Sequence, residues 1–173
     1  GLLVLHEEQA WSGSVPFHFR KDGPRLPLVP AQLRMYFTPQ HAEAATAMKA
    51  GTLVEHLDMH FGVDPQGRLQ ASMPVDHRTH QAMGLLHGGA TAALAETLGS
   101  MGSAMLIDLS THAPVGMEIT ANHLRGVQEG RVIATGELVH QGQRTHVGDI
   151  RVHDEAGRLV AICRLTNMII ERR

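Results

Sequence analysis

One long run of small and apolar residues, at positions 88–106, lies near the middle of this 173-residue sequence. Apolar side chains recur within it at helical spacing, which predicts a helix with one buried side. No other segment is large enough to cover such a helix except a sheet built from the flanking strands. We therefore predict an α+β fold in which an antiparallel sheet surrounds one long central helix. The buried stripe is formed by Leu94, Leu98, Met101 and Met105.

Turn and cap residues mark the other elements. A shorter helix is predicted to begin at Thr38-Pro39, an N-cap followed by proline at the first helical position, and to stop at Gly51. Segments 64–67 and 154–157 both begin with Asp and end with Gly, and both are predicted to be turns between strands. Strands are expected at residues 55–63, 69–75, 117–124, 131–140, 144–153 and 159–170.

Residues 1–37 are predicted to form an irregular N-terminal extension, and residues 38–173 one domain. Four prolines between positions 16 and 30 leave little room for a helix or a central strand. The apolar start of the chain is too short for the core of a signal peptide, because His6-Glu7-Glu8 follow at once. No later segment stays apolar long enough to span a bilayer.

The composition argues against several kinds of partner. A formal net charge of -2 gives no reason to expect nucleic acid or an anionic membrane surface. Aromatic residues make up only 3%, which argues against stacking on single-stranded bases. Cys163 is the single cysteine and has no internal partner for a disulfide, so we expect a reducing, cytoplasmic location.

The central helix has a second face made of small residues, with one exception. That exception is Glu96, and a carboxylate among Ala, Gly and Ser is expected to be desolvated, which would make its ionised form a stronger base or nucleophile. The alternative is a Glu96 that reaches solvent or pairs with an arginine. The small residues of this face are Gly89, Ala92, Ala93, Gly99, Ser100 and Ser103.

The start of the same helix offers hydrogen-bond donors. Gly88 and Gly89 leave the first-turn amides sterically open, and such amides suit an oxyanion that develops during acyl transfer. The alternative is that the glycines only permit a tight entry into the helix. Gly88 and Glu96 lie about 12 Å apart along one helix, too far to contact one thioester carbonyl. If both act on one substrate, two copies of the chain must share the active site.

A series of ordered motifs runs from about residue 38 to residue 170. They are Met73-Pro74-Val75-Asp76-His77-Arg78-Thr79, Gln81, Gly84-Leu85-Leu86-His87-Gly88-Gly89, Glu96, Gly99-Ser100, Gly116-Met117-Glu118-Ile119, Asn122-His123-Leu124-Arg125, Glu129-Gly130-Arg131, Gly157-Arg158-Leu159 and Arg164-Leu165-Thr166. In this order the motifs resemble the hotdog thioesterases of the paaI-like branch, which includes 4-hydroxybenzoyl-CoA and 1,4-dihydroxy-2-naphthoyl-CoA thioesterases.

The resemblance implies hydrolysis of acyl-CoA thioesters, with aromatic acyl groups favoured over long fatty chains. It implies that Glu96 attacks the thioester or activates water, and that the Gly88 amide binds the thioester oxygen. Gln81 and His87 would position that group or assist the leaving thiolate, and Ser100 would help to hold the water or the acyl group. Gly89 and Met101 would contact the acyl group.

The resemblance also implies where coenzyme A binds and how the chain assembles. The nucleotide end of coenzyme A would lie near His123, Arg125, Gln143 and Arg144, and guanidinium groups do suit phosphate oxygens. Each of these residues could equally be a solvated surface group. No cofactor is implied beyond the coenzyme A of the substrate. The family forms homodimers and also tetramers of two dimers.

The sequence gives little support to a catalytic metal site or to a serine nucleophile. A catalytic metal lacks a complete ligand set, although His56 and His60 have helical ligand spacing and other histidines lie between residues 77 and 87. Residues 99–103, Gly-Ser-Met-Gly-Ser, do not align with the nucleophile elbow of serine hydrolases. Two alternatives stay open, namely a hotdog dehydratase or hydratase that pairs His87 with the helix carboxylate, and a non-catalytic acyl-CoA binding module.

Overall fold

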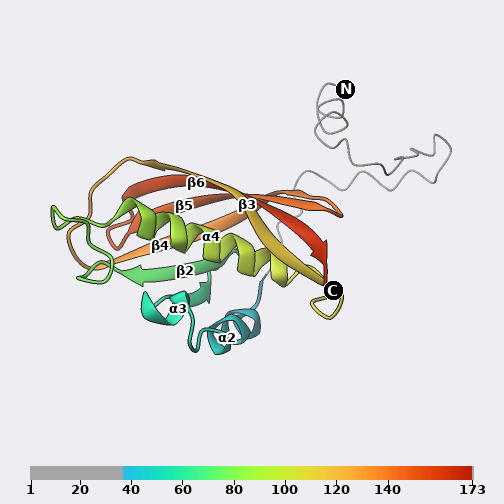
Figure 1. Ribbon diagram of the computed structural model, residues 1–173. Coiled ribbons are helices and arrows are strands. Elements are labelled where there is room, and N and C mark those ends of the chain that lie inside the picture. The colour runs from blue at the N-terminus through green and yellow to red at the C-terminus, as the bar shows by residue number, and fades with distance from the viewer. Residues whose placement is uncertain (1–36, 173) are drawn as a thin grey trace, which may run out of the picture. The chain divides into compact units, whose positions relative to one another are not determined.

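The computed structural model describes residues 37–172 (Figure 1), so the extension predicted for residues 1–37 lies almost wholly outside the described part. Three helices and six strands follow one another along this part of the chain. Their bounds are α2 Pro39–Ala47, α3 Leu53–His56, β1 His60–Val63, β2 Leu69–Pro74, α4 Gly88–Ala104, β3 His112–His123, β4 Arg131–Gln141, β5 Thr145–Asp154 and β6 Leu159–Glu171.

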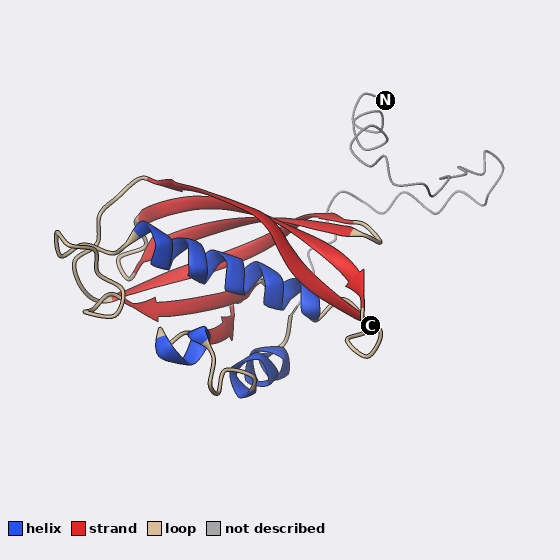
Figure 2. Ribbon diagram, in the orientation of Figure 1, coloured by secondary structure: helices blue, strands red, loops and turns tan. Residues whose placement is uncertain are grey.

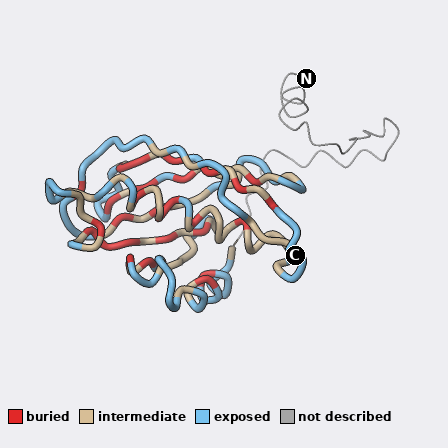
Figure 3. The backbone as a smooth tube through the Cα atoms, viewed as in Figure 1, coloured by how far each residue is buried: buried red, intermediate tan, exposed pale blue. Residues whose placement is uncertain are grey.

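The strands form one six-stranded antiparallel sheet in the order β1-β2-β4-β5-β6-β3. The sheet curves around α4, which lies across its concave face (Figure 2). Leu94 and Leu98 point from α4 into the core, with 0% and 1% of their surface exposed. Buried residues recur along α4 and along the strands of the sheet (Figure 3). The predicted α+β fold with one wrapped helix is confirmed.

Both predicted Asp-to-Gly turns are present and are built in the same way. Gly67 and Gly157 adopt φ angles of 78° and 74°, which glycine reaches at little cost. The Asp64 carboxylate accepts hydrogen bonds from the backbone and side chain of Arg68, and Asp154 does the same for Arg158. These local contacts explain why the two hairpins could be predicted from short motifs.

The extended segment predicted at residues 55–63 was wrong in its first half. Leu53–His56 is instead one helical turn, with Thr52 in extended geometry as N-cap. The Glu55 carboxylate of that turn accepts a hydrogen bond from the Gly51 amide at 2.7 Å. The chain then turns at Asp58, which has a φ of 51°, before β1 begins. Local capping therefore replaced the expected extended backbone.

The two edge strands of the sheet differ in length and in whether a helix packs against them. β1 has only four residues and packs against α2, whereas β3 has twelve and lies on the opposite edge. β3 begins five residues earlier than predicted and includes Pro114, which an edge strand tolerates. Val115 and Met117 on this edge are 45% and 52% exposed. A long edge strand with exposed apolar side chains is suited to pairing with another strand.

No helix among residues 37–172 is both long and apolar enough to cross a membrane.

Candidate active site

A pocket of about 390 Å³ lies at the N-terminal end of α4. Four of the residues predicted for the site line it, namely Gln81, Gly88, His123 and Arg125. They come from three separate segments of the chain: the loop before α4, the first residue of α4, and the end of β3 with the loop after it. The fold thus brings together side chains that lie up to 44 positions apart in the sequence.

The first turn of α4 leaves one backbone amide without a partner in the described part of the chain. The Gly89 amide donates to Nδ1 of His87 at 2.8 Å, and the amides of Ala90 and Thr91 donate to the His87 carbonyl. The Gly88 amide has no such bond among residues 37–172. It lies at the positive end of the helix and borders the pocket, so it is available to an incoming acceptor.

His87 acts as the N-cap of α4 and does not line the pocket. Because its Nδ1 accepts the Gly89 hydrogen bond, the neutral ring carries its proton on Nε2. The side chain is exposed. His87 can therefore donate a hydrogen bond outward while it holds the helix start in place.

Gln81 is presented by a tight loop. Its backbone amide donates to the Leu85 carbonyl at 2.8 Å, and the Gly84 amide returns to the Gln81 carbonyl at 2.9 Å. Gly84 has a φ of 75°, which this turn requires. The side-chain oxygen of Gln81 accepts from the Met83 amide. The carboxamide NH₂ group is therefore the part of Gln81 left to donate to a ligand.

His123 lies directly against Gly88. Its Nε2 atom is 2.8 Å from the position that a Cβ atom at residue 88 would occupy. A Cβ atom at residue 88 would push the imidazole aside, so glycine lets the ring and the amide share one end of the pocket. The sequence had pointed to His123 as a contact for the nucleotide end of coenzyme A. The structure puts its ring beside the helix start, and its contact with coenzyme A stays a prediction.

Glu96 is exposed in the single chain, so the expected desolvation was wrong for one copy. It makes no ion pair or hydrogen bond among residues 37–172. Its carboxylate lies over Gly116 of β3, with Oε1 2.6 Å from the position of a Cβ atom there. A β-bulge falls between Gly116 and Glu118, at the same place. Sequence reasoning gave no role to Gly116, whose missing side chain makes room for the carboxylate.

The face of α4 beyond Glu96 is tied to β6 by a residue that sequence reasoning missed. Asn167 is buried and contacts Gly99, Ser100 and Ser103 through its side-chain amide. Ser100 therefore lies one helical turn from Glu96 with its hydroxyl engaged by the sheet. Met101 packs partly buried against the core, and Gly89 is exposed at the helix start.

Gln143 and Arg144 lie at the opposite end of the sheet from His123 and Arg125. They belong to the turn between β4 and β5. In the β6 ladder His123 pairs with Ala161, whereas Thr145 pairs with Met168. Seven residues of strand separate these rungs, or about 23 Å. One chain therefore does not gather the predicted coenzyme A residues into one place.

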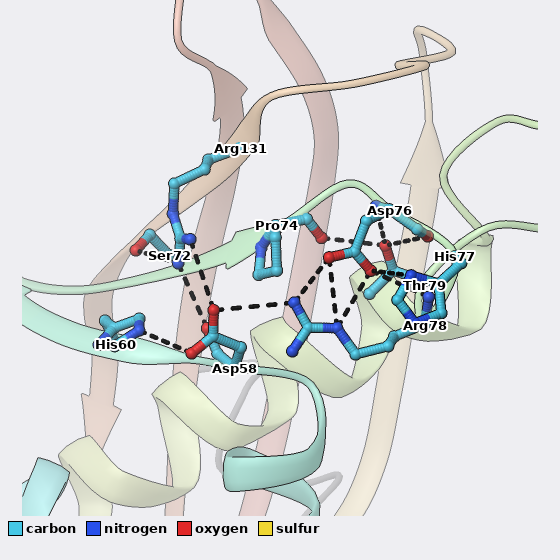
Figure 4. A network of polar contacts seen from close by, with 9 residues as sticks. All are labelled: Asp58, His60, Ser72, Pro74, Asp76, His77, Arg78, Thr79 and Arg131. Carbon is cyan, nitrogen blue, oxygen red and sulfur yellow. Dashed lines mark hydrogen bonds and ion pairs between the residues drawn. The ribbon is translucent and has the colours of Figure 1, made fainter.

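A polar network fixes the chain just before the Gln81 loop (Figure 4). Arg78 binds the Asp76 carboxylate through Nε and Nη2, and these hydrogen bonds lower the pKa of Asp76 to about 2. Asp58, at the turn before β1, lies 3.8 Å from both Arg78 and Arg131. The buried Thr79 donates to the Pro74 carbonyl at 2.9 Å. Thr79 also accepts from the His87 amide through its own carbonyl, which links this network to the start of α4.

Among the described residues, no three His, Cys, Asp or Glu side chains are grouped so that they could hold a metal ion.

Comparison with known sequences decides the family. The sequence model of the thioesterase superfamily matches residues 83–161, which include α4 and the strands β3, β4 and β5. A 1,4-dihydroxy-2-naphthoyl-CoA hydrolase of Escherichia coli is 44% identical over 128 residues, 74% of this chain and 93% of the relative. The chain belongs to the thioesterase superfamily.

Further comparisons agree with that assignment. A proofreading thioesterase of Cronobacter turicensis is 44% identical to this thioesterase, over 74% of this chain and 93% of the relative. A crystal structure of a mutant thioesterase from Pseudomonas aeruginosa matches 82% of this chain and all of its own, with a TM-score of 0.75 and 41% identity. A thioesterase structure from Haemophilus influenzae matches 80% of this chain and 94% of its own, with a TM-score of 0.71 and 35% identity. The hotdog fold and the predicted enzyme class, a thioester hydrolase, are confirmed.

Proposed function

We propose that this thioesterase hydrolyses acyl-CoA thioesters at a site shared by two copies of the chain, and that aromatic acyl groups are its preferred class. One observation carries the proposal. The unpartnered Gly88 amide opens into a pocket beside Gln81 and His123, while Glu96 of the same helix points elsewhere, over Gly116. The oxyanion donor and the carboxylate are both present, but one chain holds them apart.

Antiparallel pairing of β3 with β3 of a second copy would bring the two halves together. Such pairing is two-fold symmetric and places opposite ends of the two strands side by side. α4 runs against β3, with Gly88 near His123 at one end and Glu96 over Gly116 further along. The two-fold operation therefore carries Glu96 of the second copy toward Gly88 of the first. The exposed Val115 and Met117 become buried in the same step.

The same operation accounts for the split set of predicted coenzyme A residues. The turn that carries Gln143 and Arg144 lies by the β3 end that begins at His112, and His123 and Arg125 lie by the other end. Pairing the strands antiparallel brings Gln143 and Arg144 of the second copy to the same end of the joined sheet as His123 and Arg125. Coenzyme A is an extended, multiply phosphorylated ligand, and arginines from both copies suit its phosphate groups.

The proposed reaction begins with the thioester oxygen accepting a hydrogen bond from the Gly88 amide, assisted by the Gln81 carboxamide. Glu96 of the second copy either takes a proton from water, whose oxygen then bonds to the carbonyl carbon, or bonds to that carbon itself. In both cases the C–S bond breaks and coenzyme A leaves as a thiolate. After direct attack, water then hydrolyses the mixed anhydride between Glu96 and the acyl group, which releases the acid and restores the carboxylate. His87, whose Nδ1 is engaged by the Gly89 amide, would donate its Nε2 hydrogen to the departing group.

Aromatic acyl groups are proposed because of the relatives. The Escherichia coli relative is named for 1,4-dihydroxy-2-naphthoyl-CoA, and the resemblance in motifs points the same way. Gly89 and Ala92, the small residues of this face before Glu96, are not fully buried and give a flat ring room to approach the helix. A cytoplasmic location and a tetramer of two dimers remain predictions, the first supported by the single, buried Cys163.

The test is thiol release from benzoyl-CoA and 1,4-dihydroxy-2-naphthoyl-CoA by wild type and Glu96→Gln. The substitution keeps the size of the side chain and removes its charge. We expect wild type to hydrolyse at least one substrate and Glu96→Gln to lose on the order of a hundredfold or more in kcat. Binding of both thioesters without thiol release by wild type would instead favour the dehydratase or the non-catalytic binding module.

A further inference from the structure

We infer that Asn167 is a positioning residue of this active site, which fixes Ser100 as a hydrogen-bond acceptor for the water that attacks the thioester. The inference rests on the thioester hydrolysis proposed above and assigns the attack to water. It starts from a polar side chain on β6 that is only 1% exposed and reaches across to α4. A buried amide is costly to retain unless its hydrogen-bonding groups are satisfied.

The orientation of the Asn167 amide is determined by its neighbours. Nδ2 lies 3.3 Å from the Gly99 carbonyl oxygen and 2.9 Å from Oγ of Ser103. A carbonyl oxygen can only accept, so the NH₂ group must face Gly99 and the oxygen must face the other way. Oδ1 lies 3.3 Å from Oγ of Ser100. The amide therefore cannot be flipped without the loss of these bonds.

This orientation decides what Ser100 can do. Because Oδ1 only accepts, the single hydroxyl hydrogen of Ser100 must be donated to Asn167. The Ser100 oxygen then has lone pairs but no hydrogen for any further partner. It can accept a hydrogen bond from water and cannot donate one to a substrate oxygen. Without Asn167 the hydroxyl would rotate freely and could take either role.

The acceptor that results lies close to the carboxylate. Glu96 and Ser100 are four residues apart on α4, so their side chains lie on one face. Oε1 of Glu96 and Oδ1 of Asn167 also lie within 4 Å of one point, the position of a Cβ atom at Gly116. A water molecule held between the side chains of Glu96 and Ser100 would donate one hydrogen to Glu96 and the other to Ser100. Its lone pair would be left to face the thioester carbon.

The water oxygen bonds to the carbonyl carbon as its proton passes to Glu96, and the C–S bond breaks to release the coenzyme A thiolate. That thiolate then takes up the proton, so the carboxylate is restored. An Asn167 that only held α4 against the sheet would contribute to folding and would not affect the orientation of the water.

The experiment compares Asn167→Leu, Ser100→Ala and the double variant, with Ser103→Ala as the matched control. Ser103→Ala removes another bond of the same buried amide and leaves the contact with Ser100 in place. We expect Asn167→Leu to lower kcat about tenfold with KM within about twofold, because it frees the Ser100 hydroxyl. In the Ser100→Ala background, Asn167→Leu should change kcat less than about twofold, because the hydroxyl that Asn167 orients is already absent. Ser103→Ala should keep kcat within about twofold of wild type.

An equal loss of kcat on Asn167→Leu with and without Ser100 would overturn the inference and leave Asn167 a structural residue. So would a loss of kcat in Ser103→Ala as large as that in Asn167→Leu. Thermal unfolding of each variant shows whether the fold is kept.

A second measurement needs wild type only, in a single turnover in ¹⁸O-labelled water. The label should appear in the acid product and not in the Glu96 carboxylate. Label in Glu96 would mean direct attack by that residue and would overturn the inference while hydrolysis itself stood. Wild type that released no thiol would sink the proposed function and this inference with it.

Discussion

At the residue scale, Gly116 shows how an absent side chain can define a site. The Glu96 carboxylate occupies the space where a Cβ atom at residue 116 would lie. Gly116→Ala should therefore push the carboxylate aside without removing it. Because the displaced atoms are the end of a flexible side chain, we expect the fold to survive while kcat falls about tenfold. Thiol release and thermal unfolding, measured on the same preparation, check this.

The control for that substitution is Gly62→Ala in β1. No atom lies within 4 Å of a Cβ atom at residue 62, and the backbone there is not left-handed. This variant should keep both activity and stability. An unchanged kcat in Gly116→Ala would show that the position of the Glu96 carboxylate in the single chain is irrelevant to catalysis.

Asp76 gives a prediction about pH. Its hydrogen bonds with Arg78 lower its pKa from 3.8 to about 2, so the folded state favours the ionised form. Such a group contributes stability above its unfolded pKa and loses that contribution as the pH falls through the folded value. We expect Asp76→Asn to be less stable than wild type at pH 7 by about 1 kcal/mol, a figure discounted for partial exposure.

The difference between wild type and Asp76→Asn should shrink as the pH falls from about 4 toward 2. Urea unfolding at pH 7, 5, 4 and 3 measures it. A difference that stays constant over this range would mean that the substitution acts through packing and not through the charge of Asp76.

At the element scale, the contact between α4 and β6 depends on Gly99. A Cβ atom there would lie 2.5 Å from Cδ2 of Leu165, which is buried. Gly99→Ala should therefore destabilise the fold by about 1–3 kcal/mol through overpacking. Gly102→Ala, on the same helix, would meet nothing closer than 3.8 Å. It should be neutral or stabilising by about 0.5–1 kcal/mol, because alanine favours a helix more than glycine does.

Urea unfolding of the two helix variants separates these effects. A Gly99→Ala variant as stable as Gly102→Ala would show that Leu165 moves away freely. In that case the close fit of α4 on β6 would contribute little to the fold.

The elements that the sequence predicted well carry strong local signals. Residues 88–104 are helical because the apolar stripe and the glycines at the helix start agree. The hairpin at 154–157 follows from its Asp and Gly, through contacts within five residues. By contrast, one helical turn at Leu53–His56 has too few residues for a periodic pattern.

Contacts between distant segments could not be predicted in this way. The sequence named Gln81, Gly88, His123 and Arg125 through a family likeness, and the fold explains why they meet at one pocket. The bonds of Asn167 to α4 span 64 to 68 positions and leave no periodic signal. The exposure of Glu96 was only one of two alternatives, because small neighbours along a helix do not tell which face the sheet leaves uncovered.

At the scale of the whole molecule, the shared site predicts complementation between two inactive variants. Glu96→Gln removes the carboxylate from one copy. Gln81→Leu removes from the other copy the side-chain carboxamide that is proposed to donate to the thioester oxygen. A mixed dimer has one site with both defects and one site with none. Random mixing of equal amounts should therefore restore about a quarter of wild-type activity, although each variant alone is inactive. Thiol release after unfolding and refolding the mixture together measures this.

The two variants refolded separately and mixed afterwards serve as the control. They should stay inactive if copies exchange slowly. A co-refolded mixture that regains no activity would show that each site is built within one chain, and the two-fold arrangement would have to be abandoned.

The unequal edges of the sheet also limit how far the sheet could be extended by strands from further copies. Once β3 of two copies has paired, the joined sheet ends at a β1 strand on either side, and that strand is four residues long and packs against α2. So short an end is a poor template for a further strand. In the proposed dimer β3 has no free edge left, so the open-ended stacking of strands that leads to fibrils is not expected.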